Sequence, residues 1–297
     1  MLKRILVVAV MLALPASVLA LPGPMGPATN SGQQGEWYDW TTAPPGADDD
    51  WMNTTNWVSP DWCSKIVGEG KVQPVIGPGD VSNNNTYLMI QRGAVLTQNG
   101  ADSQVVHRQT TVWGESVGMI VGSRFNGSAY AGTSYVSTAG EMWIYDDIRV
   151  GCLTHGVEYG DQAAFIDLSG DAKLIGGNYL TVYGGNGSYI SMSGNSEIWL
   201  PLDTVFDGHR NGVYEAHETP TQTVALPTQI DNLVATGRLI TPDVGESIAY
   251  DFHFGANLFS GWNHGNHNDF IRVYVTPEPA SLLLLGLGGL ALLRRKR

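Results

Sequence analysis

The stretches Phe165–Ile175 (FIDLSGDAKLI) and Tyr189–Trp199 (YISMSGNSEIW) decide the fold of this chain. Each holds an aromatic residue, a short alternating strand, a glycine, a polar corner and a second short strand, and Tyr135–Ile144 (YVSTAGEMWI) repeats the pattern. The corner glycines Gly170 and Gly194 are 194 − 170 = 24 positions apart. A repeat of this length with two or three short strands predicts a β-solenoid, because each repeat buries its apolar side only by stacking on the next.

We therefore predict an all-β body in which residues 81–200 form a right-handed parallel β-helix between two caps. Glycine makes up 37 of the 297 residues, and it supplies the positive φ that tight corners need. No stretch between Glu36 and Val275 keeps a helical period. An antiparallel β-sandwich or jelly roll is the alternative. Residues 37–80 form the N-terminal cap and residues 201–276 the β-rich C-terminal cap.

The caps differ from the repeats in composition. In the C-terminal cap, residues 226–237 predict a short helix with Ile230, Leu233 and Val234 on one face and Gly237 as its C-cap. Strands are expected at 238–241, 247–254 and 271–275. The N-terminal cap is rich in tryptophan, which we expect to be buried over the end of the repeats, with a sugar-binding platform as the alternative. These tryptophans are Trp37, Trp40, Trp51, Trp57 and Trp62.

Part of the N-terminal cap has a recognisable pattern. The run from Trp51 to Trp57 (WMNTTNW) is followed by Ile76–Asp80 (IGPGD). This pattern resembles the opening of secreted β-helix proteins with autotransporter-like repeats, among them surface proteins of Planctomycetes-type bacteria. The resemblance implies a cap that leads through a Pro-Gly-Asp corner into the first strand.

The first 20 residues have the composition of a secretory signal peptide. Lys3 and Arg4 precede the apolar stretch Ile5–Leu14, and small residues precede the predicted cleavage after Ala20. Residues 21–36 are then a linker, and the mature chain works in an oxidising compartment. An uncleaved N-terminal anchor is the alternative.

The net charge and the number of cysteines limit the classes of ligand and partner that the chain is expected to bind. Residues 21–279 hold all 28 Asp and Glu but only 10 Lys and Arg, which gives 10 − 28 = −18. So acidic a body argues against nucleic acid and anionic lipid as partners, and it is compatible with neutral sugars or divalent cations. Cys63 and Cys152 form either a disulfide or two buried thiols, and two cysteines make no ordinary zinc site.

Two polar clusters are candidates for metal binding. His264 and His267 with Asp269 have ligand-like spacing, and a plain polar turn is the alternative. The run Asp48–Asp50 offers oxygen ligands for calcium, and a solvated loop is the alternative. We predict no cofactor.

Candidate catalytic groups are few. Asp146 and Asp147 with Arg149, and Asp161 with Asp167, would suit a polysaccharide lyase or hydrolase on a β-helix. Ten basic residues are few for an enzyme that acts on polyanions, so we predict a non-enzymatic body with no catalytic residue. Ice binding would need regularly spaced threonines, and those of the repeats follow no constant interval: Thr97, Thr110, Thr111, Thr133, Thr138, Thr154 and Thr181.

The last 21 residues form a tail with three parts. Pro277-Glu278-Pro279 ends any preceding strand, since proline lacks an amide donor. Residues 280–293 carry no charge, and Arg294-Arg295-Lys296-Arg297 would remain on the cytoplasmic side of a membrane. A 14-residue helix spans roughly 21 Å, short of a hydrocarbon core of roughly 30 Å, and snorkelling arginines would extend it. A buried C-terminal helix is the alternative.

This tail, residues 277–297, resembles the PEP-CTERM sorting signal of Gram-negative bacteria, which also carries the label "ice-binding protein C-terminal domain". The resemblance implies a transmembrane helix, recognition by an exosortase-type membrane protease, and cleavage near the motif. An inner-membrane intermediate would then reach the cell surface or the extracellular space, where such proteins are linked to exopolysaccharide and biofilm. We predict a non-enzymatic surface or matrix protein. A polysaccharide-active enzyme and a carbohydrate-binding or ice-binding module are the alternatives.

Overall fold

The computed structural model describes a body whose regular secondary structure is almost all β-strand. Its described residues are 35–37, 49–53, 57–58, 64–67, 73–84, 87–91, 93–107, 118–122, 132–145, 148–151, 163–176, 179–182, 187–202, 205–208, 226–256, 258 and 269–277. The predictions for Ala20, Asp48, Cys63, Cys152, His264, His267, and Glu278 to Arg297 lie outside these residues.

The described strands form three sheets, named A, B and C. Sheet B has the order β18 (Val205–Gly208), β15 (Tyr179–Val182), β12 (Ile148–Val150), β9 (Met119–Val121), β6 (Tyr87–Ile90), β3 (Ser64–Val67), β1 (Gly35–Trp37) and β2 (Trp57–Val58). Sheet C has the order β19 (Leu239–Ile240), β16 (Tyr189–Met192), β13 (Ala164–Leu168), β10 (Thr133–Ser137), β7 (Val95–Gln98) and β4 (Val75–Ile76). Sheet A has the order β20 (Glu246–His253), β21 (Phe270–Pro277), β17 (Glu197–Pro201), β14 (Lys173–Gly176), β11 (Glu141–Ile144), β8 (Gln104–His107) and β5 (Val81–Asn84).

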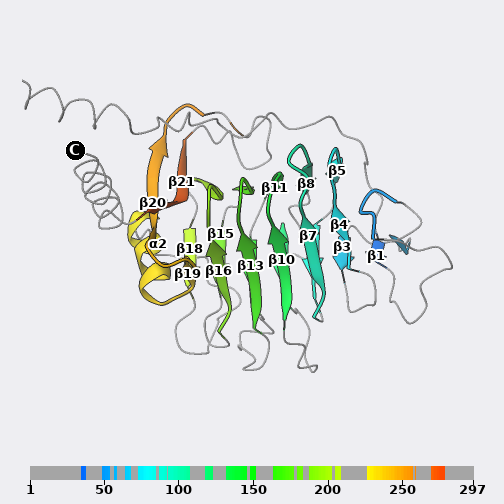
Figure 1. Ribbon diagram of the computed structural model, residues 1–297, viewed down its shortest axis with the longest axis horizontal. Helices are drawn as coiled ribbons and strands as arrows, with labels where there is room; N and C mark the ends of the chain where they lie inside the picture. The colour runs from blue at the N-terminus through cyan, green and yellow to red at the C-terminus, as the bar shows by residue number, and fades with distance from the viewer. Residues whose placement is uncertain are drawn as a thin grey trace, which may run out of the picture.

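From β3 to β19 the chain visits the sheets in the constant order B, C, A. Each strand from β3 to β16 therefore pairs in parallel with the third strand after it, and Figure 1 shows strands of one sheet side by side along the long axis. The prediction of a mostly β protein with parallel pairing is confirmed. A sandwich or jelly roll would instead pair its strands antiparallel.

The spacing of the repeat varies along the chain. Ile166 pairs with Ile190, a step of 190 − 166 = 24, as the corner glycines indicated. Tyr135 pairs with Ile166, a step of 31, and Leu96 pairs with Tyr135, a step of 39. Parallel pairing also extends beyond residues 81–200, through β3 and β4 on one side and β18 and β19 on the other.

One main core lies between the three sheets. Strands β7, β12 and β13 alternate between buried and partly exposed residues, because successive side chains point to opposite faces, whereas β6 and β9 are buried on both faces. The pairing register of the strands places apolar residues of neighbouring strands directly above one another. Burying one leucine or isoleucine contributes about 1.5–3 kcal/mol to the stability of the fold. The rows that share this core are Leu96, Tyr135, Ile166, Ile190 and Leu239 from sheet C; Leu88, Met119, Ile148 and Leu180 from sheet B; and Val105, Met142, Leu174 and Ile198 from sheet A.

Glycines build the corner between sheets C and A. Gly140, Gly170 and Gly194 have φ values of +84°, +57° and +66°, a region that L-residues with a Cβ rarely adopt. The corners also touch each other: a Cβ on Gly170 would lie 2.4 Å from the carbonyl oxygen of Thr138, and the Asn195 amide donates to the Gly170 carbonyl at 2.8 Å. The glycines therefore permit both the turn and the close stacking.

The N-terminal cap contributes directly to the core. Trp51 is fully buried in it, and its indole N–H donates to the Ser82 hydroxyl at 3.4 Å. The expected corner follows β4, where the Gly77 amide donates to Asp80 Oδ2 at 2.7 Å and β5 begins at the next residue. Burial of Trp51 is therefore confirmed. The structure does not describe the side chains of Trp37, in β1, and Trp57, in β2. Trp40 and Trp62 lie outside the described residues.

The predicted C-terminal helix is present as α2 (Leu226–Ala235), and Gly237 follows it with φ +69°. Ile230 and Leu233 are buried in the core, as expected, but Val234 is 41% exposed. The buried side of α2 runs through Gln229 and Leu233, which lie one above the other at i and i+4. Val234 is turned about 100° further around the helix axis and faces outward. The three predicted strands are present as β19, β20 and β21.

Candidate functional site

The C-terminal strand β21 joins the tail to the folded body. It pairs antiparallel with β17 through Phe270–Tyr274 and with β20 along its whole length. Phe270, Ile271 and Val273 are buried, so this strand is anchored in the core. Val275–Pro277 pair with β20 alone among the described strands. Pro277 thus ends the strand, as predicted from its missing amide donor.

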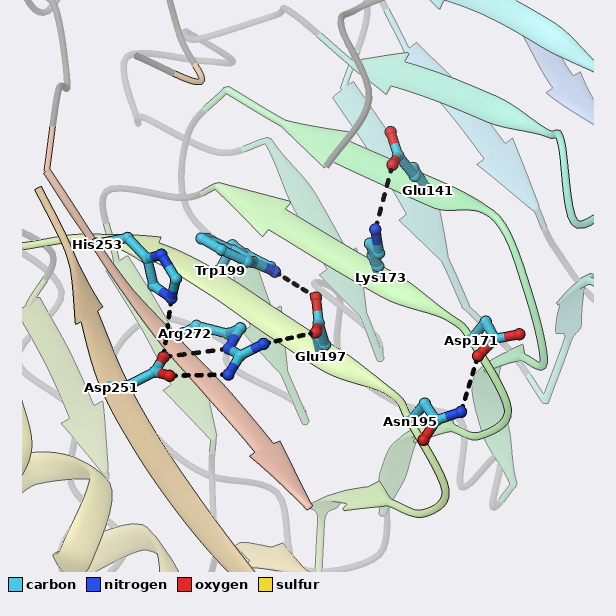
Figure 2. Close-up of polar contacts among 9 residues, drawn as sticks. All are labelled: Glu141, Asp171, Lys173, Asn195, Glu197, Trp199, Asp251, His253 and Arg272. Carbon is cyan, nitrogen blue, oxygen red and sulfur yellow. Dashed lines mark hydrogen bonds and ion pairs between the residues drawn. The ribbon is translucent and has the colours of Figure 1, made fainter. Parts of the chain in front are cut away.

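An arginine ties the three C-terminal strands of sheet A together. Arg272, on β21, is 5% exposed. Its Nη2 lies 2.8 Å from Asp251 Oδ2 on β20, and its Nη1 lies 3.1 Å from Glu197 Oε1 on β17. Figure 2 shows the guanidinium between the two carboxylates. The Arg272 guanidinium also lies 4.3 Å from the ring centroid of Tyr274, a further attraction for a cation.

Two Glu-x-Trp pairs extend this polar row along the side of sheet A that faces away from the main core. The Trp199 Nε1 donates to Glu197 Oε2 at 2.7 Å, and the Trp143 Nε1 donates to Glu141 Oε2 at 3.0 Å. Between them, Lys173 Nζ lies 3.8 Å from Glu141 Oε1 (Figure 2). Because Trp143 and Trp199 are buried in a second apolar cluster, neither ring offers a face to a sugar.

The chemistry of this row is therefore structural. Glu197 accepts from Trp199 and Arg272, and Asp251 from Arg272 and His253. A catalytic carboxylate needs an oxygen within hydrogen-bonding reach of a substrate, and these oxygens are already engaged within the protein. Sequence reasoning did not identify the Arg272 contacts, although the repeated Glu-x-Trp pattern was a signal for the row.

The two described candidate catalytic residues lie on different sheets. Arg149 lies on β12 in sheet B, whereas Asp167 lies on β13 in sheet C. Their partners in the prediction, Asp146, Asp147 and Asp161, lie outside the described residues.

The described candidates for metal binding form hydrogen bonds with the backbone. Asp269 Oδ1 accepts from the Gly255 amide at 2.9 Å, and Asp50 Oδ1 accepts from the Met52 amide at 2.8 Å. Asp49 uses its backbone carbonyl to accept from Val75 at 2.8 Å. The part of the chain that the structure describes holds no group of three or more His, Cys, Asp or Glu side chains arranged for a metal ion.

The described threonines form no row. Thr97 lies on β7, and the register continues its position as Val136, Asp167 and Ser191 on the following strands. Thr181 lies on a different sheet and is buried. An ice-binding face of stacked threonines therefore has no support among the described residues.

Burial raises the pKa of the Asp167 carboxyl above its ordinary value of 3.8. A group with a higher pKa in the folded state is favoured there in its protonated form. Ionisation of Asp167 at neutral pH therefore costs stability, and this cost disappears as the pH falls through the raised pKa toward 3.8. Burial is the main cause that raises the pKa of the Tyr189 hydroxyl, and the negative charge of Asp167 raises it further.

We therefore expect Asp167→Asn to be more stable than the unsubstituted protein at pH 7. The gain is on the order of 0.5 kcal/mol, because solvent screens a carboxyl that is only partly buried. Thermal unfolding measured between pH 3 and 8 should show the two proteins converging at the acid end. A difference that does not change with pH would contradict this assignment.

Comparison with known families assigns the tail. The PEP-CTERM protein-sorting motif matches residues 275–297, which confirms the predicted sorting signal. The match begins inside β21, so Val275–Pro277 belong both to sheet A and to the motif. The motif indicates a protein that is exported and sorted to the cell surface by an exosortase, a membrane protease.

The body has no counterpart in these comparisons: no curated protein and no solved structure matches the chain. Its resemblance to secreted autotransporter-like β-helix proteins stays a prediction. Among the described residues, no helix is both long enough and apolar enough to span a bilayer. The predicted transmembrane run at 280–293 lies outside those residues.

Proposed function

We propose that this chain is a non-enzymatic surface or matrix protein, sorted by its C-terminal motif and associated with exopolysaccharide. One observation carries the proposal: the sorting motif begins within the last strand of sheet A. A strand residue rises about 3.3 Å, so Pro277 is roughly 13 Å along the chain from the buried Val273. The protease would therefore meet a folded body with no long linker before the motif.

We further infer that the body is a right-handed parallel β-helix. The constant order of sheets B, C and A and the pairing of each strand with the third following one support this architecture. The single core between the three sheets supports it as well. Such a body exposes edges only at its ends, and there the antiparallel strands β20 and β21 complete sheet A. A rigid scaffold of this kind suits a matrix component.

The engaged carboxylates favour a non-enzymatic body over a polysaccharide lyase or hydrolase. Glu141, Glu197 and Asp251 each accept hydrogen bonds from side chains of the protein itself. A glycoside hydrolase would need two carboxyl groups, roughly 5–10 Å apart, that can reach the substrate. Activity toward a polysaccharide, measured by release of reducing ends or unsaturated products, would favour the enzyme instead.

Deleting residues 277–297 tests the sorting role. The deletion removes the motif and the tail but leaves β21 paired with β17 and with most of β20. We expect the full chain to be processed near the motif and recovered at the surface or outside the cell. The truncated chain should be folded and released as a soluble secreted body. Intact mass and fractionation distinguish these products.

A matched variant separates the motif from the tail. Replacing Pro277, Glu278 and Pro279 by alanine keeps the apolar run and the basic end, so this chain should remain unprocessed in the inner membrane. Membrane retention of the truncated chain would refute the sorting role. An intact tail on the unsubstituted protein in the inner membrane would also refute it.

A further inference from the structure

The side of sheet C that faces away from the core carries an aromatic pair. Phe165 on β13 and Tyr189 on β16 occupy paired positions. Their ring centroids are 4.6 Å apart, with 40° between the ring planes. Both side chains are partly exposed, unlike the buried Trp143 and Trp199. The described repeats therefore present aromatic surface to solvent on sheet C.

A carboxylate lies beside this pair. Asp167 is two residues beyond Phe165 on β13, so both side chains point to the same face, and it pairs with Ser191 on β16. Asp167 is partly buried, and within the described residues no side chain or amide forms a hydrogen bond or ion pair with its carboxylate. This contrasts with Glu197 and Asp251, which are both engaged.

The chemistry of this face is nearly uniform. Its two rows consist of aliphatic, aromatic, hydroxyl and carboxylate side chains, and one cation, Arg238 just before β19, occupies the position next to Tyr189 at the end of the first row. The first row is Val95, Ser134, Phe165 and Tyr189, and the second is Thr97, Val136, Asp167, Ser191 and Ile240. The strands that carry them lie side by side (Figure 1).

We propose that this face binds a segment of neutral polysaccharide. The Phe165 and Tyr189 rings pack against each other, and their exposed surfaces would contact the C–H groups of a sugar, with little loss of side-chain entropy. The Asp167 carboxylate would accept hydrogen bonds from sugar hydroxyls, and charge-assisted bonds of this kind are strong. Neighbouring strands are about 4.8 Å apart, so one pyranose ring reaches both aromatic residues.

The charge of the protein disfavours anionic ligands of similar size. The body carries 10 − 28 = −18 over residues 21–279, and the Asp167 carboxylate on this face repels phosphate groups and uronic acids. The proposal rests on the proposed function in one respect, since it requires export to a space that contains polysaccharide.

The test measures binding of neutral oligosaccharides to the full chain solubilised in a mild detergent. Cellohexaose, maltohexaose, mannohexaose and xylohexaose are the probes, titrated by calorimetry, and oligogalacturonate is the anionic comparison. We expect saturable binding of at least one neutral probe and none of oligogalacturonate. Phe165→Ala and Tyr189→Ala should each weaken it by about tenfold or more, and Asp167→Asn by about fivefold.

Phe254→Ala is the matched control, because Phe254 is a 74% exposed aromatic residue outside sheet C. It should leave binding unchanged. Because Asp167→Asn is expected to stabilise the fold at neutral pH, its loss of binding cannot result from unfolding. Binding of no neutral probe at millimolar concentration would overturn the proposal. Binding that survives Phe165→Ala and Tyr189→Ala, or binding of oligogalacturonate alone, would overturn it too.

Failure of this site is distinguishable from failure of the sorting role. A chain that is processed and recovered at the surface but binds no neutral glycan through sheet C refutes the glycan site alone. A chain whose location is unaffected by deletion of residues 277–297 refutes the sorting role, whatever sheet C binds.

Discussion

Arg272→Ala is expected to lower the free energy of unfolding by about 2–4 kcal/mol. Breaking a buried ion pair by removing one partner typically costs about 3–5 kcal/mol, because the other charge is left buried and unpaired. Here two carboxylates lose their partner: Glu197, whose side chain is 15% exposed, and Asp251, which is 33% exposed. The exposure of Asp251 reduces the penalty. Chemical denaturation of the full chain and its variant would measure the difference.

Two variants control for the loss of a cation in general. Lys173→Ala removes a cation on the same face, but its contact with Glu141 is 3.8 Å long and more exposed, so its effect should stay below about 1 kcal/mol. Arg272→Lys keeps the charge without the forked geometry and should fall between the two. Equal losses for Arg272→Ala and Lys173→Ala would show that Arg272 does not tie β17, β20 and β21 together.

Gly170→Ala is expected to cost about 3–5 kcal/mol. Its φ of +57° would strain any residue with a Cβ by about 1–2 kcal/mol. The added Cβ would also lie 2.4 Å from the Thr138 carbonyl oxygen, and relieving such a clash in a packed region costs about 1–3 kcal/mol. Because Thr138 lies in the preceding corner, the clash would push neighbouring repeats apart.

Gly187→Ala separates the two causes. Gly187 has φ +77°, but no heavy atom lies within 4 Å of the added Cβ. Only the backbone strain applies there, so the loss should be about 1–2 kcal/mol. Thermal unfolding of both variants would compare them directly. If Gly187→Ala were as destabilising as Gly170→Ala, the close contact between corners would not contribute to the stability lost in Gly170→Ala.

The C-terminal strand links these stability effects to processing. Arg272 lies three residues before the first residue of the matched motif, Val275. Loss of its ion pairs would loosen the strand that holds the motif against the body. The stability of sheet A and the position of the sorting motif are therefore properties of the same few residues.

Several features could be predicted from sequence because they are local. A corner glycine is set by backbone sterics at one residue, and an alternating strand is set by the period of its own side chains. Trp51 and the helix at α2 followed from similar local patterns. The predicted burial of Val234 was wrong because the sequence of α2 does not fix how far its buried side extends, which depends on its packing against β18 and β19.

By itself, the sequence determined the sorting signal at the C-terminus, the mostly β architecture and the corners of the repeat, because each depends on residues close together in the chain. Only the tertiary structure decided which side chains meet. Glu197 and Arg272 are 75 positions apart, and the steps between paired strands range from 24 to 39 in sheet C between β7 and β16. Because the connections vary in length, the sequence does not show which residues pair across neighbouring strands. That pairing register places Phe165 beside Tyr189 and buries the tryptophans.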